Sequence, residues 1–390
     1  MSAIIAGYAR TPFVKANGQF SGIAATALGS HAIGAALRSA GIDATDVDTV
    51  IAGQVLQAGA GQNPARQSAV GAGIPLTTPA ITVNAVCLSG MEAVIQAQRL
   101  IATGEADVVV ALGQESMTLA PHAWVGSRSG ARFGAVQLID TMEHDGLTDA
   151  FERQSMGLST EAFSAAAGLT RAAQDEWAAA SHQRLATSAE FLAGEIAPLE
   201  VATRGSAVQV AADDGLRPGT TAETLGGLRA AFSANGSITA GNSSQLSDGA
   251  AAVVLVSERW ALDYGVVGIA RVLSHALVSG PDVSLLSQPS GAIRAALARS
   301  AASVDDLVAI EINEAFAAVA VHSAADLAVD ASIVNAHGGA IALGHPIGAS
   351  GTRIVGHLAR RLAAAGDGSI GAAGICGGGG QGSAVVLESL

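Results

Sequence analysis

Cys87 is the residue of this chain whose setting first suggests chemistry. It lies between an apolar stretch expected to be a strand, Ala80 to Val83, and a helix expected from about Ser89 to Thr103. Free N–H groups at a helix N-terminus favour a thiolate, but the dipole contributes only about 0.3–1 kcal/mol. Because one pKa unit corresponds to about 1.4 kcal/mol, a reactive thiolate here needs a base or a cation beside it. The alternative interpretation is an inert buried cysteine.

His345 is the candidate partner of Cys87. It lies in the glycine-rich run GGAIALGHPIGASG, whose glycines would let the backbone approach a ligand closely. In the internal repeat described below, Gly348 takes the place of Cys87, so His345 lies three residues before the equivalent turn. If the two turns face one another, imidazole and thiol meet. The alternative is a structural histidine.

Asn313 and Glu314 follow an apolar stretch, Leu307 to Ile312, that is expected to be a buried strand. Polar side chains at such a position are costly unless they are hydrogen-bonded or used. Asn313 could also serve as the N-cap of the helix that follows, and the two roles can coexist.

Cys376 lies in the run ICGGGGQG near the end of the chain. A dinucleotide-binding glycine loop needs a long strand–helix–strand unit after it. Only eight residues follow Gly382, and Ala384 to Leu387 is expected to be a final strand. We therefore predict a tight glycine hairpin whose backbone N–H groups can form an oxyanion hole.

An internal repeat organises the chain that carries these residues. The stretches 32–53 and 292–313 are similar at an offset of 260 residues (292 − 32), and each is expected to form a helix, a turn and a strand. Similarity resumes at Ser89-Gly90 and Ser350-Gly351, each followed by a helix and a strand. Chance similarity of Ala-rich helices is the alternative, but the shared order of elements argues against it. The sequence thus predicts two βαβ-type halves.

A region of different character separates the halves. We assign 1–117 and 246–266 to the N-terminal half, 118–245 to an inserted loop domain, and 267–390 to the C-terminal half with His345 and Cys376. The insertion has Gly- and Ser-rich loops, expected helices from Arg171 to Phe191, and eight arginines. Ligands of open α/β sheets bind at the carboxyl ends of the strands, where such an insertion could hold an extended one.

Composition limits the partners of the chain. It has 20 basic and 33 acidic residues, a net charge of −13, which disfavours nucleic acid and anionic membranes. Two cysteines make no disulfide framework, no apolar run approaches the roughly 20 residues of a membrane span, and no signal-peptide pattern is evident. We expect a cytoplasmic protein. The histidines are scattered and no HExxH or CxxC motif occurs, so we expect no metal.

Five motifs together resemble those of the thiolase family, and the likeness extends over the whole chain. They are VCLSGM around Cys87, GNSSQLSDGAA, NEAFA, GGAIALGHPIGASG and ICGGGGQG. The resemblance implies an α/β fold of five layers, αβαβα, with two pseudo-twofold-related βαβαβαββ halves and an inserted loop domain. It also implies a homodimer or homotetramer.

The resemblance implies a division of chemical roles. Cys87 would be the acylated nucleophile, and His345 would activate it and help to hold the thioester oxyanion. Cys376 would exchange the α-proton of the second substrate. Asn313 would position a water molecule, and the N–H groups of Cys87 and Gly378 would form a second oxyanion hole.

The resemblance also implies the substrate contacts. Ser244 would touch the pantetheine chain of coenzyme A, Met156 and Phe316 would line the channel together with Phe232, and Arg217 would lie near the nucleotide. Two positions depart from the pattern of many short-chain members: Ser155 stands where His is frequent, and His337 where Asn is frequent. Both could alter which acyl chains are accepted.

The implied activity is that of the short-chain members, which condense two acetyl-CoA to acetoacetyl-CoA and CoA, or reverse this, through an acyl-cysteine. Coenzyme A is then substrate and product, and no cofactor is needed. A degradative 3-ketoacyl-CoA thiolase of broader chain length is the alternative. Carrier-protein condensing enzymes lack a second cysteine like Cys376. An inactive acyl-CoA-binding scaffold is disfavoured because all four proposed catalytic side chains are in place.

Overall fold

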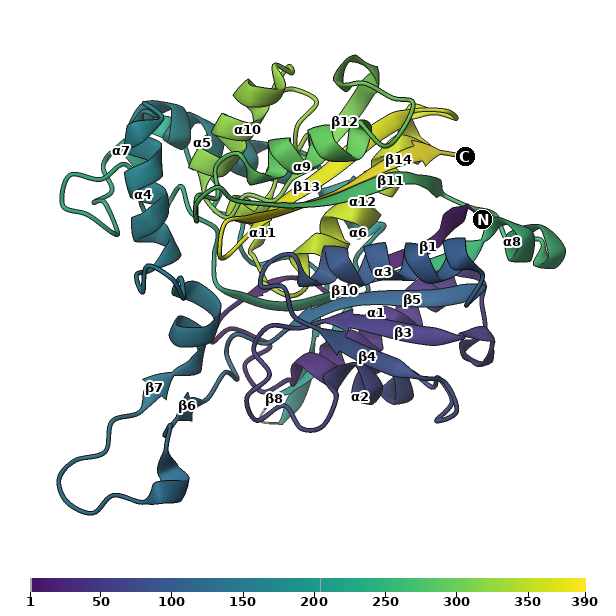
Figure 1. Ribbon diagram of the computed structural model, residues 1–390, viewed down its shortest axis with the longest axis horizontal. Coiled ribbons are helices and arrows are strands. Elements are labelled where there is room, and N and C mark those ends of the chain that lie inside the picture. The colour runs from purple at the N-terminus through teal and green to yellow at the C-terminus, as the bar shows by residue number, and fades with distance from the viewer. Residues whose placement is uncertain (1, 204) are drawn as a thin grey trace.

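A large mixed β-sheet runs through the computed structural model, which describes residues 2–203 and 205–390 (Figure 1). Its strand order is β12-β13-β14-β11-β1-β10-β5-β3-β4. Strands β1 and β11 pair only at Ile4 and Ile5, so the sheet consists of two sub-sheets joined by a short contact. The strands of the first sub-sheet are β1 (Ala3–Arg10), β3 (Thr49–Gly53), β4 (Ala80–Val83), β5 (Val108–Glu115) and β10 (Ser247–Ser257), with β2 (Val14–Lys15) beside β10. Those of the second are β11 (Ala270–Ser279), β12 (Leu307–Ile312), β13 (Ile370–Gly377) and β14 (Gln381–Ser389).

The two sub-sheets repeat one pairing pattern. In the first, β3, β5, β10 and β1 are joined by one parallel and then two antiparallel pairings. In the second, β12, β13, β14 and β11 are joined in the same way. The predicted repeat is thereby confirmed, and the strand before Cys87, the strand before Asn313 and the final hairpin are where the sequence predicted them.

The second half departs from the predicted βαβαβαββ order at its third strand. The counterpart of β4 is a single parallel bridge between Ile310 and Val334. Asn335 follows with a φ of 48°, and its side chain bonds the backbone N and O of Ile312 at 2.8 Å each. The side-chain amide of Asn335 thus occupies the backbone groups of Ile312 that a longer strand would bond. The chain therefore leaves the sheet after a single bridge.

Helices and sub-sheets alternate in five layers (Figure 1). Helices α3 and α12 lie between the sub-sheets, α1 and α2 cover the outer face of the first, and α9 and α10 cover the outer face of the second. Strand β5 shows why these strands are continuously apolar: Val108 and Val110 face the outer core, whereas Val109 and Ala111 face the central one. The helices are α1 (Ala25–Ala40), α2 (Pro64–Gly71), α3 (Ser89–Thr103), α8 (Glu258–Tyr264), α9 (Gln288–Leu297), α10 (Ala317–Leu327), α11 (Ala340–Leu343) and α12 (Ser350–Ala365).

Helices α3 and α12 approach each other closely at their first turns, where each has a glycine, Gly90 and Gly351 respectively. A Cβ on Gly90 would lie 2.7 Å from the carbonyl oxygen of Gly348, and one on Gly351 would lie 2.3 Å from the backbone nitrogen of Met91. Thr352 Oγ1 donates to the Gly90 carbonyl at 2.8 Å. Backbone therefore packs on backbone here, and the turns that precede α3 and α12 face one another, as the repeat predicted.

The region 118–245 lies over one end of this core and extends from it. Helix α5 packs against α10 and α11, and the short pair β6–β7 forms an arm that projects from the body (Figure 1). Arg171 pairs with Asp175 at 2.6 Å, and Arg184 donates to the Val334 carbonyl at 2.7 Å, so these two arginines make structural contacts. The elements are β6 (His122–Ala123), β7 (Ile139–Asp140), α4 (Met156–Ala166), α5 (Arg171–Thr187), α6 (Ala189–Ala193), β8 (Leu199–Thr203), β9 (Ser206–Val210) and α7 (Ala222–Gly226).

Within residues 2–203 and 205–390, no helix combines the length and the apolar character that crossing a membrane requires.

Candidate active site

Cys87 lies in a strained turn between β4 and α3. The residue before it, Val86, has a φ of 53°, a left-handed conformation that is unusual for a β-branched residue. Ser89 holds the turn, because its hydroxyl accepts from Ala85 N at 2.9 Å and donates to the Val86 carbonyl at 2.6 Å. The local strain presents the Cys87 side chain, 4% exposed, at the start of the helix.

Burial dominates the electrostatics of Cys87. It raises the pKa of the thiol to about 12, although the backbone N–H groups of Gly378 and of Cys87 itself stabilise the anion. The expectation that the helix start would favour a thiolate is therefore only partly right. The thiol is protonated at neutral pH and needs a base, as the size of the dipole effect predicted.

His345 is held as a neutral base beside α12. Its Nδ1 lies 2.6 Å from Ser350 Oγ, and the Ser350 hydroxyl lies 3.1 Å from the Pro346 carbonyl, to which it donates. The Ser350 oxygen is therefore an acceptor for Nδ1–H, which leaves the lone pair on Nε2. Burial, together with the charge of Arg353, lowers the pKa of His345 to about 3 and keeps the ring uncharged.

Asn313 lies against the free nitrogen of this ring. Its Nδ2 is 3.4 Å from His345 Nε2, and its backbone N donates to the Gly374 carbonyl at 3.0 Å. The buried Oδ1 of Asn313 has no hydrogen-bond partner among the described residues. Helix α10 starts only at Ala317, after Phe316, so Asn313 is not its N-cap. A buried acceptor without a partner is costly, which favours a functional use.

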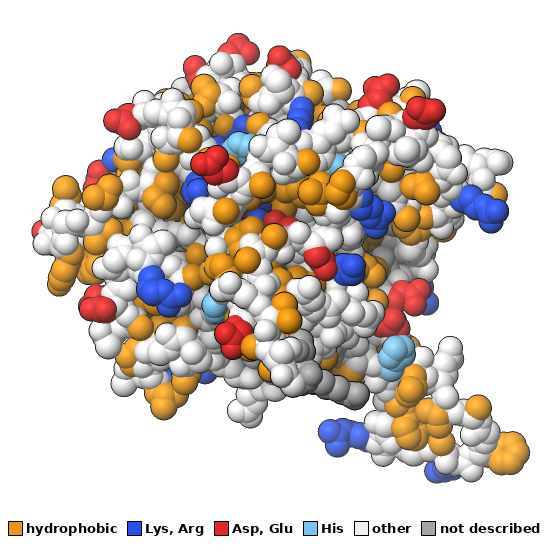
Figure 2. Space-filling model, turned by 180° about the vertical axis from the view of Figure 1, so that it is seen from behind, with side chains coloured by type: hydrophobic (Ala, Val, Ile, Leu, Met, Phe, Trp, Pro, Cys, Tyr) orange, Lys and Arg blue, Asp and Glu red, His pale blue; other side chains and the backbone are white. Residues whose placement is uncertain are grey.

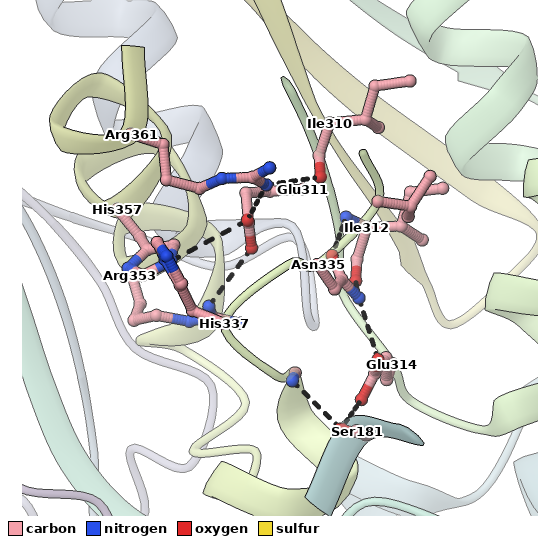
Figure 3. A network of polar contacts seen from close by, with 12 residues as sticks. Ser181, Ile310, Glu311, Ile312, Glu314, Asn335, His337, Arg353, His357 and Arg361 are labelled. Carbon is pink, nitrogen blue, oxygen red and sulfur yellow. Dashed lines mark hydrogen bonds and ion pairs between the residues drawn. The ribbon is translucent and has the colours of Figure 1, made fainter. Parts of the chain in front are cut away.

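Glu314 follows Asn313 in the chain, and its carboxylate bonds Ser181 and Asn335 (Figure 3). Its carboxylate accepts from Trp177 Nε1 at 2.9 Å and Ser181 Oγ at 2.8 Å, both on α5, and from Asn335 Nδ2 at 2.9 Å. These bonds tie the inserted region to the end of β12, so this carboxylate has a structural use.

Cys376 lies on β13 one residue before the strand ends, and its side chain is fully buried. Burial raises the pKa of its thiol above the ordinary range, and the nearby Cys87 raises it further. After Gly377, the chain turns through Gly378, Gly379 and Gly380 into β14, and the last two have φ values of 78° and 67°. The predicted glycine hairpin is present.

Both cysteines and His345 line one cavity of about 500 Å³. Its walls are mostly apolar and include four of the predicted substrate contacts, Ser244, Met156, Phe316 and Phe232. The Phe232 and Phe316 rings meet edge to face at 6.1 Å between centroids. Further lining comes from Asp140, Met142, Glu143, Leu147, Ser155, Gly157, Ser243, Leu246, Leu285, Ala315 and Ile347.

Three other predicted site residues, Asn313, Gly378 and Arg217, lie outside this lining. Gly378 lines an adjacent cavity of about 370 Å³, although its N–H bonds the Cys87 sulfur. Arg217 is exposed on a loop of the insertion, and its backbone N donates to His182 Nδ1 at 3.3 Å.

The two unusual positions differ in where they lie. Ser155 lines the cavity and caps α4, since its hydroxyl accepts from Leu158 N at 3.2 Å. His337 is not a lining residue. Its Nδ1 lies 3.2 Å from Nε2 of the neighbouring His357 (Figure 3), and its ring packs on Phe191. Only Ser155 can touch an acyl chain in the cavity directly.

Ser350 and Glu115 are functional candidates that the sequence did not single out. Ser350 orients His345, and Glu115 bonds the loop that carries it, through Gly348 N at 3.0 Å. Glu115 is a polar residue at the end of the buried strand β5. Asn313 was predicted as a site residue for the same reason, because it follows the buried strand β12. Ser350 follows His345 by five residues, but its contact depends on the fold of the turn.

Comparison with known proteins identifies the family of this chain. The sequence model described as "Thiolase, N-terminal domain" matches residues 3–259, and that described as "Thiolase, C-terminal domain" matches residues 266–389. The chain belongs to the thiolase family. The resemblance read from the five motifs and the predicted α/β thiolase fold are both confirmed.

Individual relatives match this thiolase over its whole length. A protein of Mycobacterium tuberculosis named "Probable acetyl-CoA acetyltransferase" is 50% identical, covering 100% of this chain and 99% of its own. An "Acetyl-CoA acetyltransferase" of Pseudomonas aeruginosa is 45% identical, covering 98% of each chain. The crystal structure of the Bacillus anthracis acetyl-CoA acetyltransferase superposes with a TM-score of 0.96 at 34% identity, covering 100% of this chain and 99% of the other.

Proposed function

We propose that this thiolase is an acetyl-CoA C-acetyltransferase, which condenses two acetyl-CoA to acetoacetyl-CoA and CoA or cleaves acetoacetyl-CoA in the reverse direction. The observation that carries the proposal is one cavity lined by two buried thiols and a neutral imidazole. The names of relatives that match over their full length support it.

In the first half-reaction, the Cys87 sulfur attacks the thioester carbonyl while its proton passes to His345 Nε2. The same proton then leaves with the sulfur of CoA, and acetyl-Cys87 remains. His345 suits this exchange because it is neutral and its Nε2 carries the lone pair. Asn313 positions the water molecule of one oxyanion hole, and the N–H groups of Cys87 and Gly378 form the other.

In the second half-reaction, Cys376 first gives its proton to the neutral His345, and its thiolate then takes the α-proton of a second acetyl-CoA. The resulting carbanion attacks acetyl-Cys87, and the C–C bond forms as the bond to the Cys87 sulfur breaks. That sulfur regains its proton from His345. Burial raises the pKa of the Cys376 thiol, so its ionisation needs a base, and the neutral ring of His345 lines the same cavity.

The acyl-CoA extends from the thiols past Ser244, Met156, Phe232 and Phe316, with Arg217 toward its nucleotide end. The apolar character of the cavity supports this path for a pantetheine chain. Coenzyme A is substrate and product, and no other cofactor takes part. Short acyl chains in fatty acid metabolism are the proposed substrates.

The chain acts as a homodimer or homotetramer in the cytoplasm. The projecting arm supports assembly, because hydrophobic side chains gather on it (Figure 2). Val125, Phe133 and Leu138 in this arm are each more than half exposed. A reducing compartment suits two free cysteines whose thiols do the chemistry.

The test measures the rate of CoA-dependent cleavage of acetoacetyl-CoA from the absorbance of this substrate. The same measurement is made with 3-ketohexanoyl-CoA and 3-ketooctanoyl-CoA for comparison. Fast cleavage of the four-carbon substrate with slow cleavage of the others supports the proposal. Equal or faster cleavage of the longer substrates would assign a degradative 3-ketoacyl-CoA thiolase instead. No cleavage of any by folded protein would indicate an inactive acyl-CoA-binding scaffold.

A further inference from the structure

Glu115 is a fully buried carboxylate that faces no cation. It ends β5, its side chain has no exposed surface, and no described Arg, Lys or His forms an ion pair with it. The charged or titratable groups that act on it are Asp248 and Cys87, neither of which is a cation. Burying such a group without a counter-charge is unfavourable and raises the pKa of Glu115 to about 7, so its presence at this position needs a reason.

Three backbone N–H groups from both halves of the chain bond this carboxylate. Oε2 accepts from Val55 N and from Gly348 N, each at 3.0 Å, and Oε1 accepts from Leu56 N at 3.1 Å. Val55 and Leu56 follow β3 in the N-terminal half, whereas Gly348 belongs to the loop of His345 in the C-terminal half. The carboxylate therefore bridges the two halves.

The bridge lies where the backbones of the two halves pack closely against each other. A Cβ on Gly348 would meet Gln114 O at 2.6 Å and Glu115 Oε2 at 2.8 Å, and a Cβ on Gly113 would meet Gly348 O at 2.6 Å. Gly348 is three residues from His345, and Gly90, on which a Cβ would lie 2.7 Å from Gly348 O, is three residues from Cys87. A shift of Gly348 thus changes the position of the imidazole relative to the thiol.

We propose that Glu115 is a positioning residue, whose carboxylate fastens the His345 loop to the N-terminal half and so sets where the imidazole lies relative to Cys87. This inference rests on the proposed function, because the positioned groups are those of the acyl-transfer step. The charge of Glu115 has the opposite effect on the reaction from its positioning role. It raises the pKa of Cys87 and so opposes formation of the thiolate. Geometry and charge can therefore be separated.

Two variants separate them. Glu115→Asp keeps the charge but shortens the side chain by one methylene, so it cannot span both loops. Glu115→Gln keeps the length and one acceptor oxygen but removes the charge. Asp48→Asn is the matched control: Asp48 accepts from the backbone N of Asp107 and Val108 at 2.8 and 2.9 Å, at the opposite end of β5 and away from the cavity.

The measurements are kcat and KM for acetoacetyl-CoA cleavage, and the pH dependence of Cys87 alkylation by iodoacetamide. For Glu115→Asp we expect kcat to fall about 10- to 100-fold, with KM changed less than about threefold. The pH at which alkylation of Cys87 is half-maximal should not change, because the charge is kept. For Glu115→Gln we expect a smaller loss of kcat and half-maximal alkylation at lower pH. Asp48→Asn should alter only thermal stability.

A folded Glu115→Asp variant with kcat within about threefold of the parent would overturn the proposal. So would losses of kcat that merely follow the melting temperature across all three variants. If the parent neither cleaves acetoacetyl-CoA nor forms acetyl-Cys87, the proposed function has failed. Crystal structures of the parent and Glu115→Asp then decide, since an unmoved His345 loop overturns the positioning role regardless of activity.

Discussion

His345 Nδ1 and Ser350 Oγ lie 2.6 Å apart, and the Ser350 hydroxyl donates to the Pro346 carbonyl. One serine thereby fixes both the orientation of the imidazole and the nitrogen that carries its proton. Ser350→Ala should lower kcat for acetoacetyl-CoA cleavage by about 10- to 100-fold with little change in KM, because the wrong tautomer presents N–H instead of a lone pair to the thiol.

Ser274→Ala is the control for the Ser350 variant. Ser274 is also buried and donates to the Ala296 carbonyl at 2.7 Å, but it lies on β11, outside the cavity lining. It should lose stability by about 1 kcal/mol and keep its kcat. Equal kinetics for both serine variants would refute the role of Ser350.

The two cysteines should separate the two half-reactions. Cys87→Ala should abolish acyl transfer because no acyl-enzyme can form. Cys376→Ser should still become acetylated on Cys87, but condense about 100-fold or more slowly, because a hydroxyl is a poor base. Intact-protein mass spectrometry after mixing with acetyl-CoA measures the first step. Equal loss of acetylation in both variants would contradict the proposed roles.

Acid should destabilise the fold through histidines that are neutral inside it. Burial lowers the pKa of His337 from its usual 6.5 to about 4, with the neighbouring His357 and Arg361 contributing in the same direction and Glu311 and Glu195 opposing them. The stability from its neutral form is full above pH 6.5 and is lost as the pH falls toward 4.

The measurement is the free energy of unfolding by urea between pH 7 and pH 5. His337→Asn should be less stable at pH 7, because its ring packs on Phe191 at 4.1 Å between centroids. The free energy of unfolding of this variant should fall less steeply as the pH is lowered. The difference in slope should correspond to up to about one proton bound on unfolding. Parallel curves for parent and variant would show that His337 does not titrate on unfolding.

The arm between β6 and β7 should control assembly. Replacing Val125, Phe133 and Leu138 with Ser should yield a smaller species in light scattering, since these exposed side chains (73%, 101% and 54%) would lose a partner surface. Leu262→Ser with Val267→Ser alters a comparably exposed pair, on α8 and just after it, and should leave the mass unchanged. A parent that is already monomeric would refute the role of the arm.

Local patterns predicted much of this molecule. Apolar runs located β4, β12 and the final hairpin, and the repeat predicted that the turns of Cys87 and Gly348 face one another. These features depend on spacing along the chain. The pKa of Cys87 did not follow from its helix position, because burial outweighs the helix start and burial is a property of the whole fold.

Other features depend on contacts between distant residues, so spacing could not reveal them. The bonds of Glu115 join residues 60 and 233 positions apart. The missing third strand of the second half reflects the side chain of Asn335, which competes with strand pairing. The arginines of the inserted region also differ in use: Arg171 and Arg184 hold the fold, whereas Arg217 stays exposed.

Gly348 limits how alike the two repeated halves of the chain can be. Two copies of one half, joined by a twofold axis, would begin with the same residue at both turns. A cysteine at Gly348 cannot be accommodated, because its Cβ would stand 2.6 Å from Gln114 O. The tight contact between the halves thus permits one nucleophile per chain, and symmetry must be broken at this position before the pair can close. The repeat provides two equivalent turns, and the packing leaves room for a thiol at only one of them.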